Sequence, residues 1–264
     1  MIDVAIDAAR EAGAYLKSSV GKVRQVERKE GEERNLVSEI DRTSESMIIG
    51  RIRERFPRHG ILAEESGESG SSETVWIIDP LDGTTNFLHG LPVFWVTIGI
   101  EVRGELVAGV VYDPNLDEMY TAERGAGAFL NGTRLRVSAA GDLIRSLLIT
   151  GFPYDIARNP DHAVERFVGF LMKGQAIRRL GSAALDLSYV AAGRCDGFWE
   201  VNLHPRDMAA GVLLVREAGG TVTDFEGRPM DIRTPKIVAS NGAIHRAMLD
   251  VLQSPADGMG LRIP

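Results

Sequence analysis

The stretch 76-WIIDPLDGTTNF-87 ends a run of apolar residues in two carboxylates, Asp79 and Asp82, on either side of Pro80 and one leucine. The apolar residues before Asp79 predict a buried strand, and Pro80 ends it because its ring fixes φ. Gly83 permits close backbone approach, and the residues after it can begin a helix whose free N–H groups suit an anion. The stretch therefore predicts a strand that delivers two acids beside an anion-binding turn.

Two neighbouring carboxylates repel each other, and each raises the pKa of the other unless a cation lies between them. Oxygen ligands of this kind favour Mg²⁺ or Mn²⁺ over zinc. A metal ion beside the start of a helix is an arrangement that phosphoryl transfer requires. The alternative is a surface turn, since Asp, Pro and Gly all favour turns.

Four further acidic residues stand where elements begin or end. Glu64 and Glu65 follow a short predicted strand, and Asp41 and Asp207 begin predicted helices. Each has a simple structural explanation, as a solvated strand end or as a helix cap. Taken one by one, these acids do not establish a site.

The composition limits the class of protein. The chain has 264 residues, 44% of them hydrophobic and 25% charged, as in an ordinary globular protein. The net charge of -7 argues against a nucleic-acid partner. Cys195 is the only cysteine, which indicates a reducing compartment. The N-terminus lacks the pattern of a signal peptide, and no apolar run approaches the ~20 residues of a membrane span. We expect a cytoplasmic protein with no membrane partner.

The periodicity predicts an α/β fold in one unit, residues 1–264, with two lobes. The first lobe, about residues 1–137, would hold two helices, a surface loop over 28–35, the metal site and an antiparallel meander over 93–137. The second lobe, 138–264, alternates strands with helices and predicts a layered α/β arrangement on the substrate side.

Four segments together resemble the signatures of inositol monophosphatases, in the same order along nearly the whole chain. They are LAEES (Leu62–Ser66), WIIDPLDGTTNFLHG (Trp76–Gly90), DMAAGVLLVREAGG (Asp207–Gly220) and ASN (Ala239–Asn241). The resemblance implies a layered αβαβα sandwich, the sugar-phosphatase fold, and a phosphatase that depends on Mg²⁺ and is sensitive to lithium. It also implies a homodimer, although no residue identifies the interface.

The resemblance assigns the metal ligands residue by residue. Glu64, Asp79 and the main-chain carbonyl of Leu81 would hold one Mg²⁺ ion. Asp79, Asp82 and Asp207 would hold a second, and a third, weaker ion could bind near Glu64. Mn²⁺ could replace Mg²⁺.

The catalytic group implied by the resemblance is Thr84 hydrogen-bonded to Asp41, with Glu64 beside them. This pair would orient a water that the metal ions activate and would take up its proton. The water would attack phosphorus in line, without a covalent intermediate.

The resemblance also implies the substrate contacts. Gly181, Ser182 and Ala183 would lie beside the sugar ring, and Glu200 would accept hydrogen bonds from its hydroxyls. The phosphate would lie against the metal ligands and the turn, contacting the residues Asp82, Gly83, Thr84 and Asp207. Ser182 could also be a helix N-cap, and Glu200 an exposed acid at a strand end.

One position departs from the family pattern. The family commonly has Trp before the last metal-binding Asp, whereas this chain has Arg206. A guanidinium there could pair with Asp207, contact a second phosphate or face solvent. The departure concerns the identity of the substrate more than the chemistry.

The sequence thus predicts hydrolysis of a small polyol phosphate, with inositol 1-phosphate as the first candidate. Fructose 1,6-bisphosphate, 3′-phosphoadenosine 5′-phosphate and histidinol phosphate are alternatives from the same superfamily. A non-catalytic interaction protein that keeps the fold is an alternative of another class, although the retained ligands and the Thr/Asp pair favour the enzyme.

Overall fold

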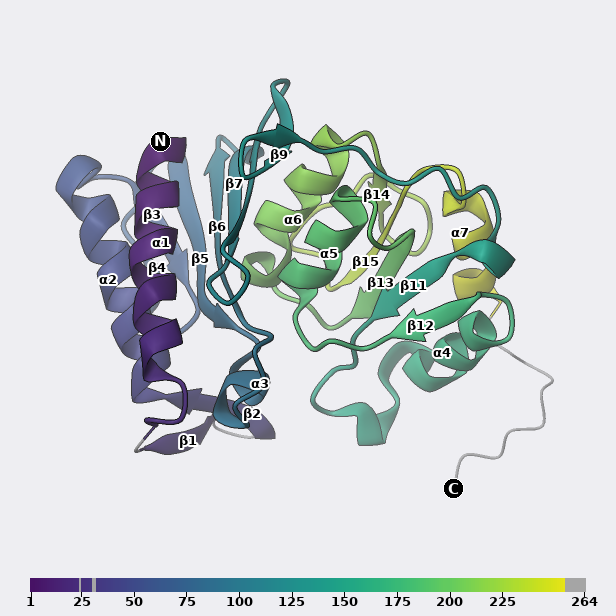
Figure 1. Ribbon diagram of the computed structural model, residues 1–264, viewed down its shortest axis with the longest axis horizontal. Coiled ribbons are helices and arrows are strands. Elements are labelled where there is room, and N and C mark those ends of the chain that lie inside the picture. Colours follow the sequence, from purple (N-terminus) through teal and green to yellow (C-terminus); the bar gives the residue numbers. More distant parts are fainter. Residues whose placement is uncertain (24, 30–31, 255–264) are drawn as a thin grey trace.

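The computed structural model describes residues 1–23, 25–29 and 32–254, and it stacks helices and sheets in five layers (Figure 1). The helical layers are α1 (Ile2–Ser19) with α2 (Glu39–Arg55), then α5 (Ala183–Ala191) with α6 (Pro205–Glu217), then α4 (Ala163–Leu171) with α7 (His245–Gln253). One sheet lies between the first and second pairs, and another between the second and third. The order is the αβαβα sandwich that the family resemblance implies.

The first sheet has eight strands, and its antiparallel part is the predicted meander. The strand order is β10 (Thr133–Arg134), β9 (Gly127–Leu130), β8 (Glu118–Glu123), β7 (Glu105–Asp113), β6 (Trp95–Val102), β5 (Thr74–Asp82), β3 (Gly60–Ala63) and β4 (Gly67–Ser69). Strands β3 and β5 pair in parallel, so their carboxyl ends meet at one edge. That edge carries Glu64, directly after β3, and Asp79 and Asp82, at the end of β5.

The second sheet has five strands, in the order β12 (Ala176–Arg178), β11 (Leu147–Thr150), β13 (Gly197–Val201), β15 (Lys236–Ser240) and β14 (Thr221–Thr223). Strands β11, β12 and β13 are parallel, and β15 is antiparallel to both of its neighbours. The short helical elements are α3 (Thr84–Leu88) and the 3₁₀ turns Leu143–Arg145, Ile156–Arg158 and Pro160–His162.

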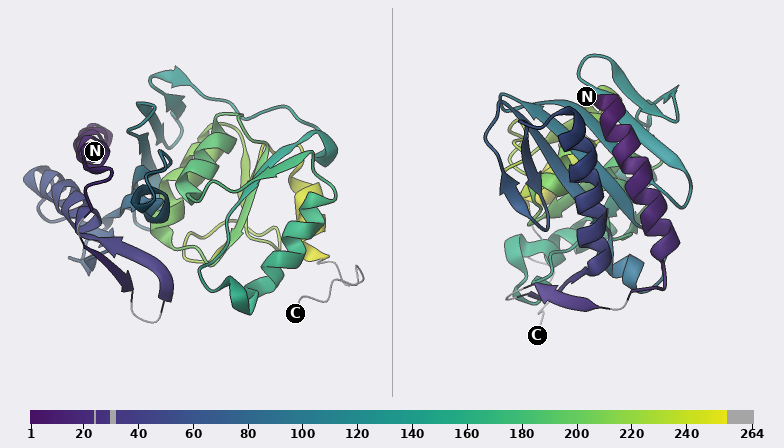
Figure 2. Two further views of the ribbon diagram at one scale, coloured as in Figure 1. Left: turned by 60° about the horizontal axis from the view of Figure 1, so that its bottom comes forward. Right: turned by 90° about the vertical axis from the view of Figure 1, so that its left-hand side faces the viewer.

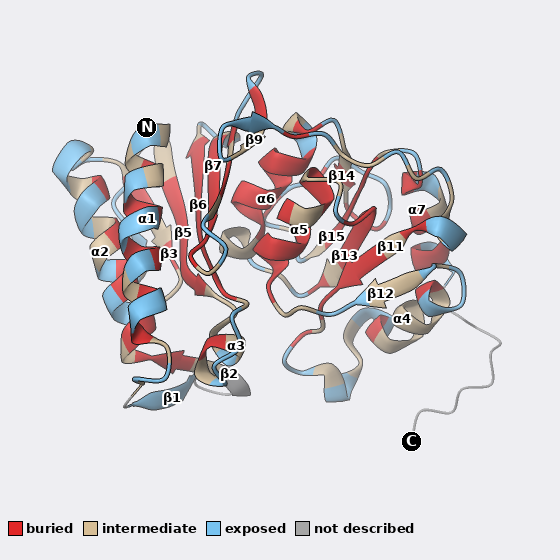
Figure 3. Cartoon of the chain, viewed as in Figure 1, coloured by how far each residue is buried: buried red, intermediate tan, exposed pale blue. Residues whose placement is uncertain are grey.

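Three apolar clusters fill the spaces between the layers, and buried residues lie on the facing sides of helices and sheets (Figure 3). Trp76, Trp95 and Trp199 each belong to a different cluster and are 0%, 1% and 3% exposed. The helix pair α5 and α6 is apolar on two sides because it packs between both sheets. The second sheet therefore cannot move independently of the first without exposing this core.

The prediction of a surface loop over residues 28–35 is wrong for the residues that the structure describes. Strands β1 (Val26–Lys29) and β2 (Glu32–Ser38) form an antiparallel ribbon of their own, while residues 30 and 31 lie outside the described residues. The ribbon leads into α2, apart from the two large sheets (Figure 2). A strand whose side chains stay in solvent, as at positions 26–28, needs no alternation of apolar and polar residues, so the pattern did not reveal it.

Gly109 on β7 fixes the distance between α6 and the first sheet. A Cβ atom at this position would lie 2.8 Å from the Cα atom of Ala210 and 3.0 Å from its carbonyl oxygen. Because the neighbouring atoms are backbone, they cannot move without moving the helix.

We expect Gly109→Ala to lower the free energy of unfolding by about 1–3 kcal/mol, because overpacking forces α6 away from the sheet. Urea unfolding would measure it. Gly50→Ala is the matched control: a Cβ atom there, on α2, meets nothing within 4 Å, and the change should stabilise the helix by up to about 1 kcal/mol. Equal stability of the Gly109 variant and the parent would contradict the close packing.

The division into lobes at residues 137 and 138 stays a prediction. Within the part of the chain that the structure describes, no helix combines the length and the apolar character needed to cross a membrane.

Candidate active site

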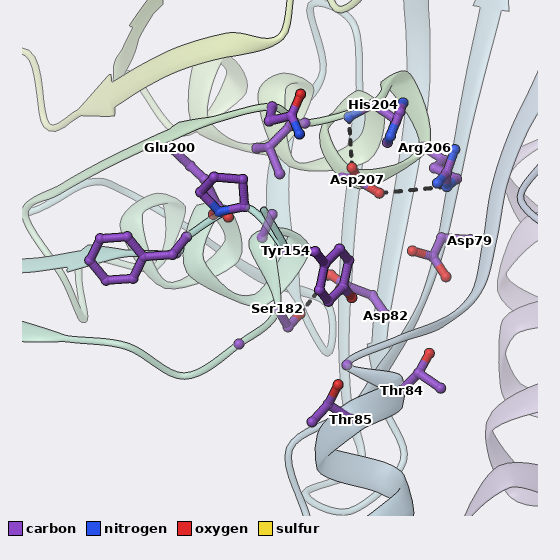
Figure 4. A pocket seen from close by; sticks show the side chains of 18 of the residues that line it. Asp79, Asp82, Thr84, Thr85, Tyr154, Ser182, Glu200, His204, Arg206 and Asp207 are labelled. Carbon is purple, nitrogen blue, oxygen red and sulfur yellow. Dashed lines mark hydrogen bonds and ion pairs between the residues drawn. The ribbon is translucent and has the colours of Figure 1, made fainter. Parts of the chain in front are cut away.

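A pocket of about 460 Å³ opens where the end of β5, the start of α3, the end of β13 and the start of α6 come together. Every predicted site residue except Asp41 lines it directly, and Asp41 reaches it through Thr84. Asp79, Asp82 and Asp207 lie around one part of the pocket, with Arg206 beside Asp207 and Glu200 on the other side (Figure 4). Asp41, Glu64 and Asp207, which have separate simple explanations in the sequence, are thus brought together, whereas Glu65 does not line the pocket.

A bulge at the end of β5 explains how Asp79 and Asp82 share one face. Asp79 pairs with Thr97 of β6, and Asp82 pairs with Trp95, so three steps on β5 match two on β6. Residues three apart in a regular strand point to opposite faces, and the one extra residue restores the same face. The expectation that Pro80 ends the strand is wrong, because β5 continues to Asp82. Pro80 lies inside the bulge, where its missing N–H group interrupts no ladder bond.

Asp41 and Asp207 are held in the same way by the helices that they begin. Asp41 Oδ2 accepts hydrogen bonds from the backbone N–H and the hydroxyl of Ser38, at 2.8 and 2.6 Å. Asp207 Oδ2 accepts from the backbone N–H of His204 at 2.7 Å. Each acid caps its helix with one carboxylate oxygen. This hydrogen bonding also fixes the direction in which the other oxygen points. Capping and a role in the site are therefore compatible.

Asp82 ties the first sheet to α5. Its Oδ2 atom accepts from the Ser182 hydroxyl at 2.7 Å and from the Ala184 backbone N–H at 2.9 Å. Ser182 Oγ also accepts from the Leu185 N–H at 3.1 Å, so this residue is an N-cap as well. The carboxylate thus stands at the first turn of α5, where the helix dipole favours negative charge.

Thr84 lies between Asp41 and the end of β5. Its hydroxyl is 3.0 Å from Asp41 Oδ1 and 3.1 Å from the carbonyl oxygen of Leu81. Gly83 precedes it with φ of 97°, and a Cβ atom there would lie 2.8 Å from the Val93 carbonyl oxygen. The glycine is therefore required for the tight turn that places the hydroxyl in the pocket.

Burial dominates the electrostatics of the acidic side of the pocket. It raises the pKa of Asp79 well above the usual range, reinforced by the charges of Glu64 and Asp82. Burial likewise raises the pKa of Asp82 to about 7, against the hydrogen bond from Ser182. The pKa of Asp207 is also raised by burial, although Arg206 opposes the shift. The positive charge near these three carboxylates is too small to neutralise their negative charge.

The donor set fits a hard divalent cation. Among the described residues, no three Asp, Glu, His or Cys side chains are already close enough to enclose a metal ion. The available donors are carboxylate and carbonyl oxygens, and Asp79 is only 3% exposed. A divalent ion between such carboxylates would favour their charged forms and so reverse the raised pKa values. Glu64, Asp79, Asp82, Asp207 and the Leu81 carbonyl are the groups that could hold it.

The other side of the pocket holds Glu200, with Gly181 and Ala183 lining it nearby. The Glu200 carboxylate occupies the space that a side chain at position 151 would need, since a Cβ atom on Gly151 would lie 2.2 Å from its Oε1 atom. Burial raises the pKa of Glu200 to about 8, although Arg179 opposes the shift. A carboxyl group keeps its proton more readily when burial raises its pKa, and in the protonated form it can both donate and accept a hydrogen bond.

The raised pKa of Glu200 makes stability depend on pH. Between its ordinary pKa of 4.5 and about 8, the folded protein binds a proton that the unfolded chain has lost, so folding becomes less favourable as pH rises. Gln cannot ionise. We therefore expect Glu200→Gln to gain stability over the parent as pH rises from 5 to 8. Urea unfolding of both proteins at the two pH values, in metal-free buffer, would measure it. An identical difference at both pH values would contradict the raised pKa.

A profile of the inositol monophosphatase family matches residues 1–255. The chain belongs to the inositol monophosphatase family. An inositol-1-monophosphatase of Mesorhizobium japonicum is 43% identical over 257 residues, which cover 97% of both chains. Nus factor SuhB of Escherichia coli strain K12 is 48% identical over 251 residues and 94% of both chains. The crystal structure of extragenic suppressor protein suhB from Bartonella henselae superimposes with a TM-score of 0.90 at 45% identity, covering 96% of this chain and 98% of that chain.

The sequence did not reveal several groups around this pocket. Arg179 lines the pocket and lies close enough to Glu200 to lower its pKa, and Tyr154 comes from the segment after β11. Glu45, on α2, accepts hydrogen bonds from the backbone of Glu65 and Ser66 and so holds the turn that follows Glu64. None stands in a motif. Glu45 falls on the buried face of α2. An acidic residue among the apolar residues of that face is the feature of the sequence that could have indicated its role.

Proposed function

We propose that this inositol monophosphatase homologue is a phosphomonoesterase that requires Mg²⁺ and hydrolyses a small polyol phosphate, with inositol 1-phosphate as the preferred substrate. The observation that carries the proposal is the convergence of four carboxylates and the Thr84–Asp41 hydrogen bond on one pocket. A pocket of about 460 Å³ suits a single phosphorylated ring. The relative from Mesorhizobium japonicum, named an inositol-1-monophosphatase, supports this substrate.

The metal ions would be held by Glu64, Asp79, Asp82, Asp207 and the carbonyl of Leu81. Bound Mg²⁺ lowers the pKa of the attacking water and offsets the charge of the phosphoryl oxygens. The fixed oxygens of Asp82 and Asp207 restrict where such an ion can sit, because each carboxylate is already anchored on a helix terminus. Two ions, with a third weaker one, remain the prediction.

Thr84 and Asp41 supply the proton acceptor. While the Thr84 hydroxyl donates to Asp41 Oδ1, its lone pairs are free to accept a hydrogen bond from water. The Asp41 carboxylate is 1% exposed, and burial raises its pKa, so it is ready to take up a proton that Thr84 passes on. The pair thus orients the water and receives its proton as it attacks phosphorus.

The alcohol end of the substrate would lie between Glu200 and residues 181–183. Glu200 can exchange hydrogen bonds with ring hydroxyls. Gly181, just before the N-cap of α5, lines the pocket, and a Cβ atom there would lie 2.6 Å from a side-chain nitrogen of Arg179. Fructose 1,6-bisphosphate, 3′-phosphoadenosine 5′-phosphate and histidinol phosphate remain the alternative substrates.

A second candidate function is a non-catalytic interaction, favoured by the 48% identity with a relative named Nus factor SuhB. The two functions predict different outcomes for one set of assays. The assay measures release of inorganic phosphate by the purified protein from each of the four candidate esters, with Mg²⁺, with EDTA and with added lithium. Release from inositol 1-phosphate that needs Mg²⁺ and falls with lithium supports the enzyme. No release from any ester contradicts it and favours the interaction.

We also propose a cytoplasmic homodimer. Light scattering coupled to size-exclusion chromatography would give twice the chain mass of 28.7 kDa if the dimer is correct.

A further inference from the structure

Arg206 lies inside the acidic half of the pocket, at the start of α6. Its Nη2 atom is 3.5 Å from Glu64 Oε1, and its Nε atom is 3.7 Å from Asp207 Oδ1. The side chain is 21% exposed, so the guanidinium is largely withdrawn from water. An arginine therefore contacts one proposed ligand of each metal ion.

The contacts are ion pairs without well-formed hydrogen bonds. Charge-assisted N–H···O bonds are usually about 2.7–2.9 Å long, and both distances here are longer. Among the residues that the structure describes, Arg206 Nε is buried with no hydrogen-bond partner. Burial lowers the pKa of Arg206, but the charges of Glu64 and Asp207 outweigh it, so the guanidinium stays positive. The side chain is held by charge and can leave without breaking a tight network.

The charge of Arg206 adds to that of the proposed metal ions. Four ionised carboxylates, Glu64, Asp79, Asp82 and Asp207, are neutralised in full by two divalent ions. The guanidinium adds one more positive charge within about 4 Å of two of them, where the interaction is only weakly screened. Arg206 and the last divalent ion therefore compete for the same carboxylates.

We propose that Arg206 is an internal cation that occupies part of the acidic cluster and weakens binding of the last divalent ion. The inference rests on the proposed metal-dependent function. It makes Arg206 a residue that sets the metal requirement by its charge, through Glu64 and Asp207, and not by contact with the substrate.

The test is a titration with Mn²⁺ alone, in which electron paramagnetic resonance counts the free ion. We expect Arg206→Gln to bind its weakest ion at least about tenfold more tightly than the parent. Arg206→Lys keeps the charge and should remain within about threefold of the parent. Arg179→Gln is the matched control, because it removes a charge from the Glu200 side of the same pocket and should change Mn²⁺ affinity by less than about twofold. Circular dichroism would confirm that each variant is folded.

The outcomes separate the inference from the proposed function. Equal Mn²⁺ affinity of the parent and Arg206→Gln, with ions bound to both, would overturn the role of Arg206 and leave the metal-dependent function standing. A second titration, with inorganic phosphate, tests direct contact: if Arg206→Gln changes the phosphate affinity and leaves the Mn²⁺ affinity unchanged, the inference is also overturned. Absence of any bound Mn²⁺ in all variants would overturn both proposals.

Discussion

Replacing Asp82 by Asn is expected to lower kcat by on the order of 10³-fold while the fold stays intact, since a divalent ion supplies several kcal/mol of transition-state stabilisation. Asn has no negative charge to hold the ion. It retains a carbonyl oxygen that can accept from the Ser182 hydroxyl and the Ala184 N–H, which are the contacts that tie α5 to β5. The change therefore removes the negative charge at position 82 and keeps the hydrogen bonds to α5.

The measurement is the rate of phosphate release at saturating substrate over a range of Mg²⁺ concentrations, together with the melting temperature of the metal-free protein. A metal-free Tm within a few degrees of the parent would show that the hydrogen bonds to α5 survive. Turnover within tenfold of the parent at the same Mg²⁺ concentration would sink the assignment of Asp82 as a metal ligand.

The second large effect is expected for Thr84→Ala, which should lower kcat by about 10²–10³-fold because general base assistance is lost. The change removes the hydroxyl that lies 3.0 Å from Asp41 Oδ1 and 3.1 Å from the Leu81 carbonyl oxygen. It leaves every proposed metal-binding carboxylate in place. Affinity for Mg²⁺ should therefore change much less than kcat.

Thr84→Ser is the matched control, because it keeps the hydroxyl and removes only a methyl group. It should retain activity within about tenfold of the parent. Asp41 is a poorer position for this test, since its Oδ2 atom caps α2 through Ser38 and a substitution would also lower stability. If Ala and Ser at position 84 lower kcat equally, the hydroxyl is not the proton acceptor.

The sequence predicted most of the fold because its periodicities are strong. The apolar run before Asp79, the alternating strands of the meander and the amphipathic helices all correspond to elements of the structure. The ribbon of β1 and β2 was missed because pairing between backbones left no apolar pattern in its exposed residues.

The acids of the pocket could be predicted as a group only through the resemblance to a family. Asp41 and Asp207 are ordinary helix-capping residues by position, and a cap and a site ligand have the same sequence signal. The parallel pairing of β3 and β5 brings Glu64 beside Asp79, and the packing of α6 between two sheets brings Asp207 to them. Asp41, on α2, is joined to the site by the Thr84 hydroxyl. Arg206 contacts Glu64, which lies 142 residues away in the chain, and Asp207, which is its neighbour. Local sequence predicts only the contact with Asp207.

The hydrogen bond between Asp82 and Ser182 has a consequence for the order in which the protein folds. It joins residues 100 positions apart, whereas the meander from β6 to β9 is built from neighbouring hairpins. Closing a long loop costs chain entropy before any contact forms, so local hairpins precede it. A growing chain that has emerged only as far as the meander already displays Glu64, Asp79 and Asp82 but lacks the helix that bears Asp207. Binding of the proposed metal ions is then expected to be one of the last events of folding, and it would report that both sheets have docked.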